Sequence, residues 1–168
     1  MSKMRFFFIF LVTLILFIVN TIFAQFNWEI SNSNDISKIL PVRKQVEVYN
    51  ELLVWRLDEI LPKIMEREGI DLWLVINFEY YEDPVYMSLI TRPRFSARRL
   101  SILLFHNSPT EGFKKLTANW HGSSSCGPMY TSIFTDRSKG ANHQFTVVAD
   151  YIKKHNPDLV LLDISLPD

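Results

Sequence analysis

The sequence predicts an α/β domain: a three-layer fold in which a mixed sheet has helices on both faces. Two observations predict it. Three short apolar runs, "DLWLVIN", "RRLSILLFH" and "PDLVLLDIS", have the length and composition of strands. Stretches with helical periodicity, residues 42–68 and 143–155, separate and flank them. Helices that alternate with apolar strands are typical of a sheet covered on both sides.

The first helix is expected over residues 42–68, where apolar residues recur at intervals of three and four. The stripe runs from Val46 through Leu53 and Leu57 to Ile64, and it is widened by Leu52, Trp55, Leu61 and Met65. Pro62 lies inside the pattern and removes a backbone donor, so we expect a kink there. Gly69 is expected to end the helix in the left-handed conformation.

The strands follow in order. "DLWLVIN" (71–77) and "RRLSILLFH" (98–106) are predicted as buried strands, and "FKKLTANW" (113–120) as a more exposed strand antiparallel to the second. "MYTSIFT" (129–135) predicts a short strand or turn. A helix is then expected over 143–155, and "PDLVLLDIS" (157–165) is predicted to be a last buried strand.

The N-terminus predicts export. "MSKMR" is basic, residues 6–19 are apolar except for Thr13, and Ala24 is a small residue before Gln25. This order is typical of a signal peptide cleaved after Ala24. The alternative is an uncleaved membrane anchor, because the apolar run is close to the length that spans a bilayer. We expect a linker or arm over residues 25–40 and one domain over 41–168.

The composition excludes some classes. Without residues 1–24, the chain has 16 basic and 18 acidic residues, which does not favour nucleic-acid binding. Its one cysteine, Cys126, excludes an intramolecular disulfide. The four histidines are never three to five residues apart, so the spacing predicts no metal site and no resident cofactor in this chain.

The polar cluster after the first strand has two interpretations. Glu79, Glu82 and Asp83 are either a general acid and base at a strand end, or the start of a helix. The second is favoured because Asp83 suits an N-cap and Pro84 suits the first helical position.

Four arginines, Arg92, Arg94, Arg98 and Arg99, lie within eight residues. They predict either an anion-binding patch or a solvated loop whose charges pair with the preceding acids, and the solvated loop is favoured because surface ion pairs are common. Together with Trp120 and His121 they are the candidate contacts to a substrate cleft or a second domain.

"HGSSSCG" (121–127) offers serine and cysteine nucleophiles beside His121. The glycines, however, do not have the G-x-S-x-G spacing of a nucleophile elbow. A flexible loop is the favoured interpretation, and a serine or cysteine hydrolase is the least favoured function.

An amphipathic helix followed by "REGIDLWLVINFEYYEDPVY", "ARRLSILLFHN" and "NPDLVLLDIS" resembles the N-terminal domain of exported Xaa-Pro aminopeptidase-like metallopeptidases. These belong to the creatinase, prolidase and aminopeptidase P family, and the resemblance covers residues 40–165. It implies a ribonuclease-H-like N-terminal domain that shapes the substrate cleft and makes oligomer contacts.

The resemblance also implies a following pita-bread catalytic domain. Its ligands, two Asp, one His and two Glu, hold a pair of Mn, Co or Zn ions that activate water for cleavage before proline. Because the chain stops after "LPD", we expect this catalytic domain to be absent and the chain alone to be inactive. Expected partners are that domain, a second copy in a homo-oligomer and the peptide substrate. The alternative function is a stand-alone peptide-binding module in which Tyr80, Tyr81 and Trp120 act with the arginines.

Overall fold

The computed structural model describes residues 39–165. The chain divides into two units, residues 1–41 and 42–168, and the described fold belongs to the second. The predicted signal peptide and most of the predicted linker lie outside the described residues. Within residues 39–165, no helix is both long enough and apolar enough to cross a bilayer.

The sheet has five strands in the order β4-β3-β2-β1-β5. β1 (Leu72–Phe78) lies between β2 (Leu100–Ser108), which is antiparallel to it, and β5 (Val160–Ser165), which is parallel. β3 (Gly112–Thr117) pairs antiparallel with β2, and the two-residue β4 (Thr131–Ser132) pairs parallel with β3. The mixed sheet and the β2–β3 pairing confirm the prediction.

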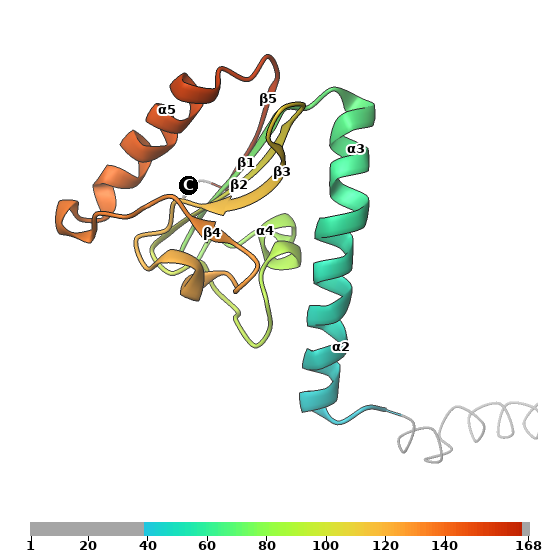
Figure 1. The fold of residues 1–168 in the computed structure, drawn as a ribbon. Coiled ribbons are helices and arrows are strands. Elements are labelled where there is room, and N and C mark those ends of the chain that lie inside the picture. Colours follow the sequence, from blue (N-terminus) through green and yellow to red (C-terminus); the bar gives the residue numbers. More distant parts are fainter. Residues whose placement is uncertain (1–38, 166–168) are drawn as a thin grey trace, which may run out of the picture. The chain divides into compact units, whose positions relative to one another are not determined.

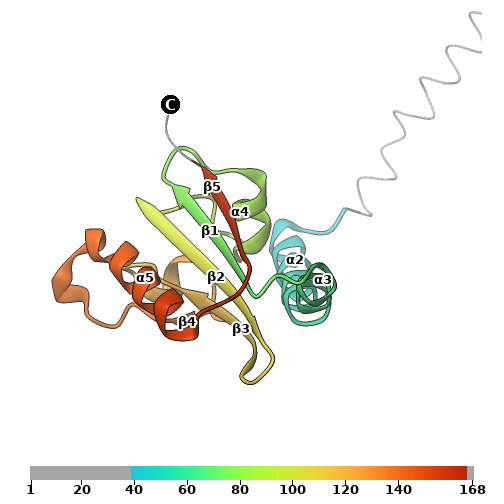
Figure 2. The same cartoon turned by 90° about the horizontal axis from the view of Figure 1, so that it is seen from above.

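Helices cover both faces of this sheet (Figure 1, Figure 2). On one face α2 (Val42–Trp55), α3 (Leu61–Glu68) and α4 (Pro84–Leu89) enclose a core that includes Leu53, Val75 and Phe105. On the other face α5 (Gln144–His155) packs Val148 against Leu74 and Leu104. Alternate residues of β1, β2 and β3 point to opposite faces, so each of these three strands contributes to both cores. The α/β prediction is therefore confirmed, and the arrangement is compatible with the three predicted layers.

Helices α2 and α3 form one continuous rod, joined by a π turn over Arg56–Ile60 (Figure 1). The Leu61 N–H donates to the Arg56 carbonyl, five residues back. The expected irregularity at Pro62 thus takes the form of a wider turn directly before the proline. Gly69 ends α3 with φ 66°, which confirms the left-handed cap.

The π turn changes which side chains α3 buries. Leu53, Leu57 and Met65 are buried, at positions whose spacing is a multiple of four. The prediction that Ile64 belongs to the buried stripe is wrong, since it is exposed. A π turn holds an extra residue per turn, so the face that meets the core moves one position along the sequence.

β5 differs from the prediction. It pairs with β1 over its whole length, but Leu161, Leu162 and Ile164 remain exposed. The expectation of a buried strand is wrong because β5 lies at the end of the described sheet. An apolar sequence shows which side chains a strand could bury. The position of the strand in the sheet decides which of those side chains are buried.

Short 3-10 turns complete the order: Gly122–Ser125 before β4, then Arg137–Lys139 and Ala141–His143 before α5.

Candidate functional site

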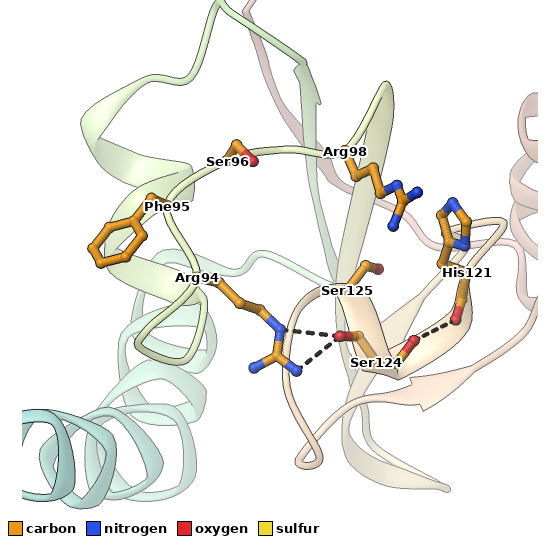
Figure 3. Close-up of a pocket in the computed structure, with 7 residues that line it drawn as sticks. All are labelled: Arg94, Phe95, Ser96, Arg98, His121, Ser124 and Ser125. Atoms are coloured by element: carbon orange, nitrogen blue, oxygen red, sulfur yellow. Dashed lines mark hydrogen bonds between the residues drawn. The ribbon is translucent and has the colours of Figure 1, made fainter. Parts of the chain in front are cut away.

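Two loops meet beyond the end of β1. The arginine-containing loop (residues 90–99) runs from α4 to β2, and the His121 loop (residues 118–127) follows β3. Phe78, the last residue of β1, pairs with Leu100, and the Ala118 N–H donates to the Ile102 carbonyl. A pocket of about 240 Å³ lies between the loops (Figure 3), lined by Arg94, Phe95, Ser96, Arg98, His121, Ser124 and Ser125. Sheet ends of this kind are common ligand sites in α/β folds.

The acidic residues after β1 hold the arginine loop through its backbone. A Glu82 oxygen accepts a hydrogen bond from the Ala97 N–H at 2.9 Å, and a Glu79 oxygen accepts from the Arg99 N–H at 3.1 Å. Asp83 caps α4 by accepting from the Tyr86 N–H at 2.8 Å, as predicted. No described ion pair joins these acids to the arginines, so the expected charge pairing is wrong.

Arg92 and Arg94 maintain the shape of the site. Arg94 donates two hydrogen bonds to the Ser124 carbonyl, at 3.0 and 2.8 Å, and so ties one loop to the other (Figure 3). The Arg92 guanidinium lies 5.0 Å from the centre of the Tyr49 ring, and its backbone is held by Asn50. Both arginines are thus engaged within the domain.

Arg98 and Arg99 are different. Both are exposed, and among the described residues their guanidinium groups have no hydrogen-bond or ion-pair partner. Figure 3 shows the Arg98 side chain directed toward the His121 ring. Burial, and then the positive charges of Arg98, Arg137 and Arg99, lower the pKa of His121. The Glu79 and Glu82 carboxylates bind the backbone of this loop, and no carboxylate among the described residues pairs with the Arg98 or Arg99 guanidinium group.

Trp120 forms part of the support for His121. Its indole N–H donates to the Arg137 carbonyl at 3.1 Å, and its ring meets the His121 ring edge-on, with centroids 4.7 Å apart. Arg137 in turn donates to the His121 carbonyl at 3.4 Å. The Trp120 side chain is half-buried and fixes the neighbouring imidazole, and its role as a contact to a substrate cleft or a second domain stays a prediction. Arg137, which the sequence analysis did not single out, enters the site from the segment before α5.

The serines and the cysteine do not form a nucleophilic site. The Ser124 hydroxyl donates to the His121 backbone carbonyl at 2.8 Å, and the Ser125 hydroxyl donates to the Gly122 carbonyl at 2.8 Å. Cys126 is buried, and burial raises the pKa of its thiol to about 11. A thiol with such a pKa stays protonated at neutral pH, and the thiolate is the nucleophile. The serine or cysteine hydrolase is not supported.

Two of the remaining histidines are brought together elsewhere. His106 and His155 lie beside each other near the β2–β3 turn, with ring centroids 5.0 Å apart, although 49 positions separate them in the sequence. Local spacing gave no signal of this because the two side chains come from a strand and a helix.

The chain matches no family model, no curated protein and no solved structure. What the pocket does chemically follows from its own groups. The free guanidinium group of Arg98 beside the His121 imidazole, with the positive charge of Arg99 near it, is suited to an anionic group. A carboxylate suits it best, because a guanidinium binds one through two parallel hydrogen bonds.

Proposed function

We propose that this chain is the non-catalytic N-terminal domain of an exported, proline-directed metallopeptidase of the creatinase, prolidase and aminopeptidase P family. In this proposal the arginine loop and the His121 loop form one wall of the substrate cleft. The observation that carries it is the pocket that Arg98 and His121 line: neither the Arg98 guanidinium nor that of the neighbouring Arg99 has a carboxylate partner among the described residues. A peptide carboxylate, or an acidic side chain of a docked domain, would supply one.

The sheet supports the same proposal. Three consecutive antiparallel strands are followed, after a helical connection, by a strand parallel to the first. This arrangement is compatible with the ribonuclease-H-like layout that the sequence resemblance implies. Family members of this kind carry their metal pair in a separate catalytic domain, and that domain and a second copy of the chain are the proposed partners.

Hydrolysis of an Xaa-Pro dipeptide or tripeptide tests whether catalysis requires the proposed second domain. We expect the purified chain to be inactive with added Mn²⁺, Co²⁺ or Zn²⁺, and a protein extended by the coding sequence after Asp168 to be active. Turnover by the chain alone that a chelator abolishes would mean that the domain has its own catalytic site. A downstream sequence without paired Asp, His and Glu residues would contradict the family assignment.

The role of the pocket is tested by comparing Arg98→Ala with Arg94→Ala. Arg98 is free, so its removal should leave the melting temperature of the chain nearly unchanged and raise the KM of the extended enzyme. Arg94 ties two loops together, so its removal should lower stability by about 1–2 kcal/mol. An unchanged KM in Arg98→Ala would show that the pocket is not part of the substrate cleft.

A second candidate function is a stand-alone peptide-binding module. It is favoured by Tyr80, whose side chain is 87% exposed and whose backbone has φ 73°. The left-handed backbone of Tyr80 belongs to a turn that the Tyr81 N–H closes on the Phe78 carbonyl at 3.1 Å, and this turn presents the aromatic ring to solvent. Micromolar binding of a proline-containing peptide by the chain alone, lost in Tyr80→Ser, would favour this module over the peptidase domain.

A further inference from the structure

Three metal-ligating side chains meet at the opposite end of the sheet from the Arg98 pocket. His106 comes from β2, Glu111 from the turn between β2 and β3, and His155 is the last residue of α5. One ligand atom from each lies within 4.8 Å of the other two, and this is the one such group among the described residues. The Nδ1 atom of His155 and a Glu111 oxygen are 3.3 Å apart.

The fold fixes the two imidazoles. His106 is almost fully buried on the face of the sheet that α5 covers, where it pairs with Leu72. The Tyr151 hydroxyl is 2.8 Å from Nδ1 of His106, and the Tyr151 ring stacks on His155 with centroids 4.2 Å apart. Tyr151 and His155 are four residues apart in α5, so they lie on the same face of the helix. One tyrosine thus positions both histidines.

The arrangement has the chemistry of a zinc-type site. Two imidazoles and a carboxylate are a common three-ligand set for Zn²⁺, and ligand atoms about 2.0–2.1 Å from a tetrahedral ion are about 3.3 Å from one another. The contact between His155 and Glu111 already has that separation. A ligating histidine usually has its other ring nitrogen held by a hydrogen bond, as Tyr151 does here for Nδ1 of His106. Nε2 is then the nitrogen of His106 that remains for a cation.

Lys114 competes with a metal cation for the Glu111 carboxylate. Its ammonium lies 2.7 Å from the Glu111 carboxylate and neutralises it. The pair is exposed to solvent, where such contacts contribute little stability, so a cation held by three ligands is able to displace the lysine. Lys114 therefore sets how tightly the site binds.

We propose that His106, Glu111 and His155 bind one divalent cation of the zinc class, with a fourth position open to water. The open side is the groove of about 560 Å³ that Glu111, Lys114, Tyr151 and His155 help to line. The ion joins the end of α5 to the β2–β3 turn, two elements that are distant in the sequence. The site is separate from the metal pair of a catalytic domain and does not depend on the proposed peptidase function.

The test is a calorimetric titration of the untagged, chelator-treated full chain with Zn²⁺ alone. We expect one ion per chain and a higher melting temperature in its presence, since a cation that binds only the folded state stabilises it. Glu111→Gln and His155→Gln should each weaken binding at least tenfold. Both positions are less buried than His106, so these variants are expected to fold, and circular dichroism checks that they do.

His121→Gln and His143→Gln are the matched controls. They remove histidines outside the cluster and should leave Zn²⁺ affinity unchanged. With Co²⁺ as the probe, the visible absorption of a tetrahedral ion should appear in the native chain and be lost in His155→Gln. Absence of stoichiometric binding, or equal losses in the cluster and control variants, would overturn the site.

Lys114→Ala gives a test in the opposite direction. Removal of the competing ammonium should tighten Zn²⁺ binding several-fold. Lys63→Ala removes a more exposed lysine of α3 that is paired with Glu59, and should have no effect. An equal gain in both variants would show that Zn²⁺ responds to net charge alone, and would count against the site.

Discussion

At the scale of single residues, Asp163 on β5 has an unfavourable environment. Burial, and then the negative charge of Asp83, raise its pKa above the ordinary value of 3.8. The folded state therefore holds a proton that the unfolded state has released, and stability falls as the pH rises through this interval. At a pH above the raised pKa of the folded state, the full loss of stability is present. At a pH below 3.8, where Asp163 is protonated in both states, there is no loss.

Asp163→Asn should therefore raise the melting temperature at pH 7, because the amide carries no charge to desolvate. The gain should shrink as the pH falls and disappear once Asp163 is protonated in both states. Thermal unfolding from pH 3 to pH 7 measures it. Asp150→Asn, an exposed residue of α5, is the control and should show no comparable gain. A gain in Asp163→Asn that does not change with pH would mean that the charge is not its cause.

Residues with local roles were predictable from the sequence, and residues with distant partners were not. The Asp83 cap and the Gly69 turn depend on the few residues around them, and both were predicted correctly. Arg94 binds Ser124, thirty positions away, and nothing in its own segment indicates that partner. The sequence shows four arginines close together, but which of them are free had to come from the fold.

At the scale of elements, the π turn decides which residues of α3 carry stability. Met65 is 1% exposed and Ile64 is 39% exposed, although a regular helix would have favoured Ile64 as the core residue. Met65→Ala should cost about 2–5 kcal/mol of unfolding free energy because it leaves a cavity in the core. Ile64→Ala should cost clearly less, and urea denaturation of both variants measures the difference. Equal losses would mean that α3 keeps the regular helical phase.

The helix prediction failed at this point for a definable reason. The intervals of three and four that identify a helix assume about 3.6 residues in every turn. The sequence contains Pro62, which signals an irregularity, but it does not state whether the chain bends or widens its turn. Bending would have kept Ile64 in the stripe, whereas the wider turn replaces it with Met65.

At the scale of the whole molecule, the free side of β5 favours self-association. Leu162 is 55% exposed on a strand whose one described neighbour is β1. An apolar strand at the edge of a sheet is able to pair with the same strand of a second copy. We expect the purified chain to form dimers or larger species as its concentration rises, measured by size exclusion with light scattering.

Leu162→Lys should shift the chain toward monomer. Leu52→Lys, which adds the same charge at a leucine 53% exposed on α2, should not. An equal shift in both variants would mean that net charge causes the effect and that β5 does not form the contact between copies. The sequence identified β5 as apolar, but the identity of its neighbours is a property of the whole sheet.

The position of β1 between β2 and β5 sets the order in which the sheet assembles. β2 and β3 follow β1 closely in the sequence, whereas β5 begins about eighty residues later. A chain that emerges from the ribosome, or from an export channel, therefore completes the antiparallel half of its sheet while one side of β1 is still open. Short loops close at a lower entropic cost than long ones, so the same order is favoured in refolding from denaturant. Until β5 arrives, β1 presents an apolar template to any other extended chain nearby.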